Sequence, residues 1–194
     1  MRMPAREIVA NQRLVKPEDY EALIERLEDP AERLTVRLQH DSFLRPSDLA
    51  NLRLSELAEE DGILIIRKAT KKAKVVSNSI LMEETAGDLR AYVKSAGIAD
   101  YLFEAKPGKP RHRTWPNHVF VKHGWDGSPR DFRRTGATNW SEDLASLMAQ
   151  GGWSDPKTIL THYRRNLMER HLKAFEKTVG IAKDRPDEDI PGYG

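Results

Sequence analysis

The sequence has no cysteine among its 194 residues, which excludes disulfides and thiolate metal sites. It also has no apolar run long enough to span a membrane, and its first residues, MRMPAREIVANQRL, lack the apolar core of a signal peptide. These absences indicate a cytoplasmic protein that is not associated with a membrane. The hydrophobic content of 39% is sufficient for one sizeable core.

A large net charge is missing as well, because 32 Lys and Arg residues nearly balance 30 Asp and Glu residues. The basic residues are nevertheless unevenly distributed, in three islands at 67–74, 106–113 and 130–134, the last continuing at 164–165. This pattern predicts one face that binds an anionic ligand and an opposite face that is solvated. Charge scattered over a solvated surface is the alternative that composition alone leaves open.

Most of the chain shows the apolar spacing of amphipathic helices. Pro17 and Pro46 suit the first turn of a helix, and the acidic residues after them favour its N-terminus. Gly97 and the pair 151–152 mark helix ends. Helices are expected at about 17–28, 31–41, 46–57, 82–95, 115–125, 130–140, 141–149, 155–163 and 166–179.

The hydrophobic period changes near residue 58. Residues 62–66 and 73–77 read as two strands, and 67–72 as the lysine-rich turn of a β-hairpin between them. Residues 104–113 read as a loop rich in Pro, Gly and Lys. The sequence therefore predicts a mostly α-helical α+β domain with a small antiparallel sheet on one side. We expect this domain to cover residues 17–180, between an N-terminal arm (1–16) and an acidic tail (181–194).

The stretch from 128 to 165 carries the most suggestive chemistry. It contains Arg130, Arg133 and Arg134, followed by Trp153 and Tyr163. Guanidinium groups bind phosphate in a bidentate manner and stay charged at any working pH. A tyrosine close to such a cluster is a candidate nucleophile toward phosphorus.

Four segments, taken in order, resemble the catalytic domain of the tyrosine recombinases, the phage integrase family. FLRPSDLANL (43–52) is similar to the first arginine box of that family, and IIRKATKKAKVV (65–76) to its lysine-bearing hairpin. SPRDFRRTGAT (128–138) is similar to the second arginine box, and GGWSDPKTILTHY (151–163) to the box that carries the tyrosine. The resemblance covers roughly residues 17–179.

The resemblance implies a role for each matched residue. Arg45 and Arg133 would clamp the phosphate, Lys68 would protonate the leaving 5′-oxygen, Trp153 would occupy a position held by histidine or tryptophan, and Tyr163 would attack the DNA phosphodiester. A 3′-phosphotyrosyl bond would form and a 5′-hydroxyl would be released. A 5′-hydroxyl of a partner strand would then attack this bond in the reverse reaction. Bond energy is conserved, so no metal and no nucleotide cofactor are expected.

Several positions leave alternatives open. Arg130 stands where the family has histidine, and a guanidinium cannot accept the tyrosine proton. His162 is a possible assistant in that proton transfer, although a solvated neighbour is the plainer interpretation. Lys71 is the fallback for Lys68, because hairpin length varies. Trp153 is alternatively a core aromatic residue.

The resemblance also implies partners. We expect double-stranded DNA with a specific recombination site on a mobile element, bound by a homo-oligomer, a tetramer on DNA and a monomer when free. The helix at 166–179 would pack on a neighbouring protomer or on its own chain, and the N-terminal core-binding domain of the family would be absent. A catalytically decayed DNA-binding module and a type IB topoisomerase-like relaxase are the competing interpretations. The expected DNA-binding residues are Arg67, Lys71, Lys72, Lys74, Lys106, Lys109, Arg111 and Arg134.

Overall fold

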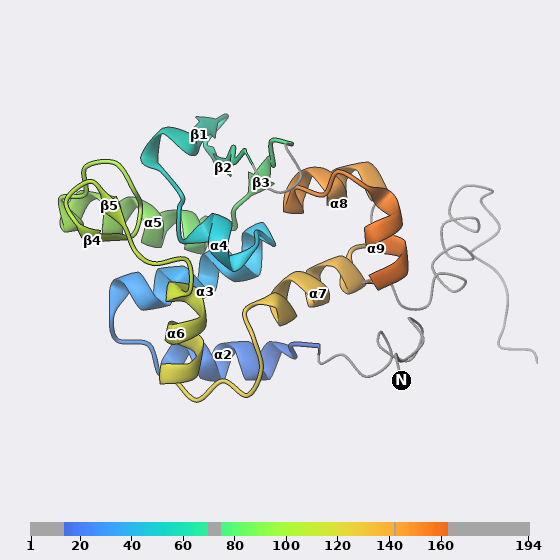
Figure 1. Ribbon diagram of the computed structural model, residues 1–194, viewed down its shortest axis with the longest axis horizontal. Helices are drawn as coiled ribbons and strands as arrows, with labels where there is room; N and C mark the ends of the chain where they lie inside the picture. Colours follow the sequence, from blue (N-terminus) through green and yellow to red (C-terminus); the bar gives the residue numbers. More distant parts are fainter. Residues whose placement is uncertain (1–13, 70–74, 142, 163–194) are drawn as a thin grey trace, which may run out of the picture. The chain divides into compact units, whose positions relative to one another are not determined.

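The computed structural model describes residues 14–69, 75–141 and 143–162, all of which belong to one compact unit. Figure 1 shows mostly helices, with a small sheet to one side. The helices are α2 (Pro17–Glu25), α3 (Pro30–Ser42), α4 (Pro46–Leu49), α5 (Glu83–Ala96), α6 (Trp115–Lys122), α7 (Arg130–Asn139), α8 (Leu144–Gly151) and α9 (Pro156–His162), with a 3₁₀ turn η1 (Leu54–Glu56). The strands are β1 (Leu57–Glu60), β2 (Ile63–Ile66), β3 (Ser79–Ile80), β4 (Glu104–Lys106) and β5 (Lys109–Pro110).

Helix α3 is the central element, and α5, α6 and α7 all pack against it (Figure 1). It begins sharply because the Asp29 carboxylate accepts hydrogen bonds from the backbone N–H groups of Ala31 and Glu32, at 2.8 and 3.0 Å. Its Leu38 belongs to a core shared with α4, α5 and β2, whereas its Val36 belongs to a second core shared with α2, α6 and α7. A third, smaller core lies among α7, α8 and α9.

The sheet differs from the predicted hairpin in where its strands lie. Strand β2 pairs antiparallel with β1 and with β3, in the order β1-β2-β3. The turn between β1 and β2 is Asp61-Gly62, with both residues at positive φ, a turn signal that the prediction passed over. The prediction of a returning strand at 73–77 was wrong in its described part, because the pairing falls at Ser79–Ile80 with only an isolated bridge from Ala69 to Val76.

Two other predicted elements were also wrong. The helix expected over 46–57 ends at Leu49, because the following chain pairs with residues 100–102 instead: the N–H of Leu102 donates to the carbonyl of Leu52 (2.7 Å), and that of Leu54 to the carbonyl of Asp100 (2.8 Å). The loop expected over 104–113 contains the hairpin β4–β5. The segments 166–179 and 181–194 lie outside the described residues, as does most of the arm expected at 1–16. Val15, in the described part of that arm, is buried against the second core.

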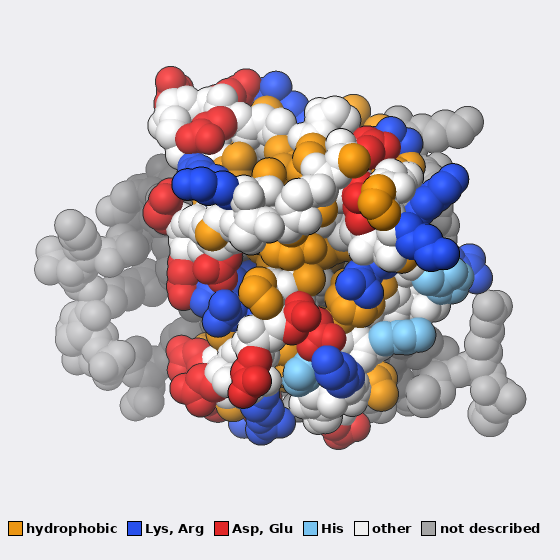
Figure 2. Space-filling model, turned by 90° about the vertical axis from the view of Figure 1, so that its left-hand side faces the viewer, with side chains coloured by type: hydrophobic (Ala, Val, Ile, Leu, Met, Phe, Trp, Pro, Cys, Tyr) orange, Lys and Arg blue, Asp and Glu red, His pale blue; other side chains and the backbone are white. Residues whose placement is uncertain are grey.

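The remaining predicted helices match α2, α3 and α5–α9 to within a few residues, so the predicted mostly helical α+β class is confirmed. In the part of the chain that the structure describes, no helix combines the length and the apolar character needed to cross a bilayer. Charge is unevenly spread, as expected: on the face drawn in Figure 2, Lys, Arg and His side chains gather on the right-hand side, and Asp and Glu are more frequent on the left.

Candidate active site

Arg45 is placed by a strained turn at the end of α3. Phe43 adopts the left-handed conformation with φ of 52°, which costs a side-chain-bearing residue about 1–3 kcal/mol. The next residue is secured by a hydrogen bond of 2.7 Å from Gln39 Nε2 to the carbonyl of Leu44. Arg45 then caps α4, whose first residue is Pro46. The turn thus presents Arg45 at the mouth of α4, as the sequence predicted.

Arg133 projects from α7 into the interior and is almost completely buried, with 3% of its surface exposed. Its Nη1 donates to the backbone carbonyl of Phe43 and, at 2.5 Å, to that of Gly151. Its guanidinium lies over the indole ring of Trp153, 3.6 Å from the ring centroid. One side chain therefore joins the turn before Arg45 to the end of α8.

The end of α8 is shaped by two glycines. Gly152 has φ of 63° and lets the chain turn back toward the core. A Cβ on Gly151 would collide with the indole of Trp153, so this close approach requires glycine. Trp153 is buried (4% exposed), and its backbone N–H donates to the carbonyl of Met148 at 3.0 Å. The carbonyl of Gly151 and the indole of Trp153 therefore both contact Arg133.

These residues surround a cavity of about 640 Å³. A second cavity of about 480 Å³ adjoins it and shares Arg45, Ser47, Arg113 and Arg130. No acidic side chain is among the described residues that line the second cavity. Such a concentration of guanidinium groups is suited to phosphate. The first cavity is lined by Arg45, Ser47, Asp48, Asn51, Arg113, Arg130, Arg133, Arg134, Trp153 and Thr158.

Asp48 is a buried carboxylate at this site that the sequence reasoning treated only as part of a helix start. Burial raises its pKa, and the positive charges of Arg45, Lys68 and Arg133 partly oppose that rise. Its Oδ2 lies 3.7 Å from Arg45 Nη1. The three predicted cationic residues, Arg45, Lys68 and Arg133, are therefore all close enough to Asp48 to affect its pKa.

Lys68 is also buried, with 6% of its surface exposed. Its Nζ donates to the backbone carbonyl of Asn51 at 2.7 Å, and to Glu56 Oε1 and Oε2 at 2.9 and 2.7 Å. Asn51 also lines the cavity, so one residue connects the ammonium to the cavity wall. Lys68 itself is not among the described residues that line the cavity.

The second arginine box supplies two more side chains. Arg130 is exposed, begins α7, and lines both cavities. Arg134 lines the first cavity while its Nη1 donates to Asp131 Oδ1 at 2.5 Å. Asp131 is in turn buried and accepts from the N–H of Ser128 at 2.7 Å, which fixes the start of α7. Arg130, predicted to stand at the histidine position of the family, therefore offers hydrogen-bond donors to the cavity but no group that accepts a proton.

Several of the predicted site and DNA-binding residues lie outside the described residues. Tyr163, Lys71, Lys72, Lys74 and the side chain of His162 are outside the described residues. Helix α9 ends at His162, next to Tyr163 in sequence, and its Thr158 lines the cavity.

The other basic residues predicted to contact DNA differ in their surroundings. Arg67 pairs with Glu60 at 2.5 Å, and the Arg111 guanidinium lies 3.9 Å from the ring centroid of Trp115. Lys106 and Lys109 are exposed on the β4–β5 hairpin. Arg113, which lines both cavities, was not singled out from the sequence, although it belongs to the basic island 106–113.

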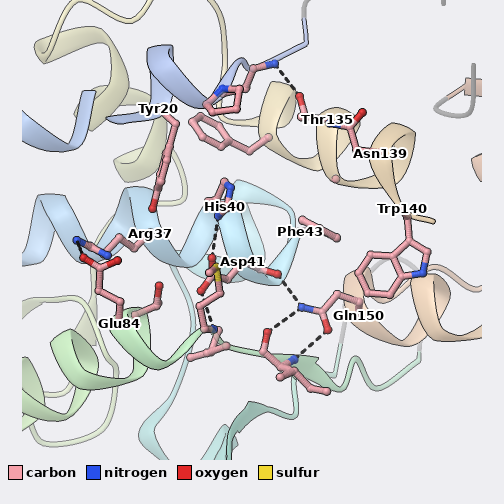
Figure 3. A pocket seen from close by; sticks show the side chains of 18 of the residues that line it. Tyr20, Arg37, His40, Asp41, Phe43, Glu84, Thr135, Asn139, Trp140 and Gln150 are labelled. Atoms are coloured by element: carbon pink, nitrogen blue, oxygen red, sulfur yellow. Dashed lines mark hydrogen bonds and ion pairs between the residues drawn. The ribbon is translucent and has the colours of Figure 1, made fainter. Parts of the chain in front are cut away.

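A separate apolar groove of about 670 Å³ lies on another part of the described residues (Figure 3). Tyr20 and His40 stack in it with ring centroids 4.3 Å apart, and Phe43 and Trp140 meet edge to face at its other end. Burial raises the pKa of Tyr20 to about 12. Gln150 closes one wall, since its amide bonds the carbonyl of Asp41 at 2.7 Å. The groove shares Phe43 with the turn before Arg45.

The fold and the site together define a mostly helical α+β domain with arginines gathered around one cavity. A family model described as "Phage integrase family" matches residues 13–170. The chain belongs to the phage integrase family, as the sequence predicted. No curated protein matches it significantly in sequence.

Three solved structures with the same fold are distant from this chain in sequence. XerA recombinase is similar over 92% of this chain and 66% of its own, with a TM-score of 0.66 and 18% identity. The XerH site-specific recombinase bound to its difH substrate has a TM-score of 0.65 and 15% identity over 84% of this chain and 53% of its own. The Tn1549 transposon integrase in complex with transposon right end DNA has a TM-score of 0.67 and 16% identity, covering 87% and 66%. The chain spans less than two thirds of the length of each of these structures.

Proposed function

We propose that this chain is the catalytic domain of a site-specific tyrosine recombinase, which cleaves and rejoins DNA strands through Tyr163. One observation carries the proposal: Arg45, Arg133 and Trp153, from three separate segments, meet at one cavity, and α9, the helix next to Tyr163 in sequence, also lines it. Membership of the phage integrase family supports the same reading.

The residues around the cavity suit each step of the reaction. The Tyr163 oxygen attacks phosphorus, a tyrosyl–phosphorus bond forms, and the bond from phosphorus to the 5′-oxygen breaks. Arg45 and Arg133 stabilise the extra negative charge on the non-bridging oxygens, because their guanidinium groups are held in place before the phosphate arrives. Lys68 supplies the proton to the leaving 5′-oxygen. A 5′-hydroxyl of a partner strand then reverses these steps and frees the tyrosine.

Arg130 changes how the tyrosine loses its proton. A guanidinium in the position of the family histidine binds a phosphate oxygen but does not accept a proton. We infer that the tyrosine proton leaves to solvent or through His162, and that the surrounding positive charge favours the phenolate, whose ordinary pKa is about 10. The rate of cleavage should consequently rise with pH over a wider range than in a relative that carries histidine.

We propose double-stranded DNA carrying a specific recombination site as the partner, inside the cell. The two adjoining cavities support this, because together they are lined by five arginines, Arg45, Arg113, Arg130, Arg133 and Arg134. The exposed lysines of the β4–β5 hairpin extend the same basic character.

We also propose that several copies, four by analogy with the family, assemble on DNA. The apolar groove supports this proposal, since Met82 and Ile80 line it with 61% and 54% of their surfaces exposed. The apolar face of an amphipathic helix from a second copy, for which the segment 166–179 is the candidate, would cover it. Met82→Glu should allow a single copy to bind DNA but prevent larger complexes in a gel-shift titration. Ile63→Glu, which alters an apolar side chain that is 47% exposed and is not among those lining the groove, is the control.

The reaction is tested with a library of nicked DNA duplexes that carry a randomised core. Wild-type protein should form covalent adducts that resist SDS, and sequencing of the trapped DNA should reveal one preferred site. Tyr163→Phe should form none. Binding without an adduct would favour the decayed DNA-binding module. Relaxation of supercoiled plasmid with no preferred site would favour a type IB topoisomerase-like activity.

A further inference from the structure

We propose that Glu56 is a latch for Lys68: in the protein without DNA it holds the lysine behind the wall of the cavity, and the bound phosphate must draw the lysine away before a strand is cut. The inference rests on the proposed function, since it takes Lys68 as the general acid. It adds a residue that lies outside the four resembling segments and that acts by positioning another side chain.

Every proton of the Lys68 ammonium is already engaged. An ammonium group has three donors. The three acceptors within 2.9 Å are the carbonyl oxygen of Asn51 and the two carboxylate oxygens of Glu56. A general acid must direct a proton at the leaving oxygen. In this arrangement Lys68 has no donor left for such an oxygen.

The Lys68–Glu56 ion pair is also shielded from water. The side chain of Lys68 is 8% exposed and that of Glu56 is 18% exposed. An ion pair in such surroundings is screened much less by salt than a surface pair, so it does not open freely. The nearby charge of Asp48 does not replace Glu56, because it faces Arg45 and Arg133 as well as Lys68.

Lys68 is close to the cavity in which the leaving oxygen would lie. Asn51 binds the ammonium through its backbone and also lines the cavity, so Lys68 is separated from the cavity by one residue. A phosphate held by Arg45 and Arg133 brings new anionic oxygens to that wall. These oxygens compete with Glu56 for the ammonium, and the competition makes strand cleavage conditional on correct placement of the phosphate.

Glu56→Gln is the informative variant. It keeps an oxygen that can accept the hydrogen bond from the N–H of Arg53, now 2.8 Å from Glu56 Oε2, so the local turn is preserved. It removes the negative charge that retains the lysine, and a charge-assisted hydrogen bond is about twice as strong as a neutral one. Glu60→Gln, which removes an equal charge from the partner of Arg67 on the same sheet, is the matched control.

The latch itself is tested on the protein alone. Reductive methylation followed by mass spectrometry should leave Lys68 several-fold less modified than Lys16, whose side chain is 70% exposed. Glu56→Gln should remove most of that protection, and Glu60→Gln should not. A wild-type Lys68 modified as readily as Lys16, or a protection that Glu56→Gln leaves intact, overturns the latch whatever the protein does to DNA.

The consequence is tested by single-turnover cleavage of the duplex recovered from the library. Glu56→Gln should cleave about five times faster than wild type, in line with the loss of one charge-assisted contact. A substrate with sulfur in place of the 5′-bridging oxygen needs no proton for its leaving group, so Glu56→Gln and wild type should cleave it equally. A slower or unchanged rate on ordinary DNA overturns the inference. If the sulfur substrate does not restore cleavage by Lys68→Ala, the proposed role of Lys68 is refuted. If the wild-type protein forms no adduct at all, the proposed function is refuted.

Discussion

The guanidinium of Arg133 lies over the indole of Trp153, with its central carbon 3.6 Å from the ring centroid. This contact joins the second arginine box to the segment that leads to the tyrosine. The same guanidinium donates hydrogen bonds to the backbone carbonyls of Phe43 and Gly151. Arg133 therefore has a structural role in addition to its proposed role in binding phosphate.

The two proposed phosphate-binding arginines should differ in what they contribute to stability. Arg133→Ala should lower the free energy of unfolding by about 2–4 kcal/mol, because it leaves the buried carbonyl of Gly151 and the part-buried carbonyl of Phe43 without their donor. Arg45→Ala should cost about 1 kcal/mol or less, since its nearest carboxylate is 3.7 Å away and its side chain is 28% exposed. Both should lose cleavage. Urea denaturation measures the difference, and equal midpoints would contradict it.

Gly151→Ala should disturb the site through Trp153. The added methyl group would collide with the indole ring, so Trp153 must shift away from Arg133. We expect a loss of about 1–3 kcal/mol in unfolding free energy and a large fall in cleavage. Gly87→Ala is the control, because its Cβ would meet no atom within 4 Å and it lies inside α5. That change should stabilise the protein by about 0.5–1 kcal/mol, and a similar effect of the two changes would refute the close approach.

Asp48→Asn should stabilise the protein without DNA at neutral pH. The folded-state pKa of Asp48 is raised above its unfolded value, so the ionised carboxylate opposes folding at pH 7. The cost disappears as the pH falls through the folded and then the unfolded pKa, because both states then carry the protonated acid. The variant should be about 1 kcal/mol more stable at pH 7 and no more stable near pH 3. Thermal unfolding across this range is the measurement, and a variant that is less stable at pH 7 would contradict the prediction.

Arg113→Ala should weaken DNA binding uniformly across sequences. Arg113 lines both arginine-rich cavities, so its loss removes about one phosphate contact. The slope of log K against log salt concentration should become less steep by about 1. Arg53→Ala is a matched control, since Arg53 pairs with Asp100 at 3.0 Å and is not among the residues lining either cavity. Fluorescence anisotropy at several salt concentrations measures both, and equal slopes for Arg113→Ala and wild type would refute the contact.

The local signals in the sequence predicted the helices well and the strands poorly. Helix α3 begins at a capping aspartate and a proline, and α5 ends at a glycine, signals that depend on a few neighbouring residues. The helix expected over 46–57 failed because Leu52 and Leu54 bond residues 100–102, which no local pattern reveals. Strand β3 was misplaced by a few residues for the same reason, since its register depends on β2.

The sequence named candidate site residues but not the contacts that they make. The order of four segments was sufficient to name Arg45, Lys68, Arg130, Arg133, Trp153 and Tyr163, and their catalytic roles stay predictions. Asp48 and Arg113 were not singled out, because a carboxylate after a proline and an arginine in a loop have many ordinary explanations. The structure identifies them by the cavity that they line.

The sequence by itself determined the family, the mostly helical class and the residue types available for phosphate chemistry, because these follow from short motifs and local spacing. Only the tertiary structure decided that Arg133 also supports the backbone and that Lys68 is bound to Glu56. Those contacts join residues 90, 18 and 12 positions apart. Over such separations the partners of a buried charge depend on how the segments pack, since a buried charge must find compensating groups wherever the fold brings them.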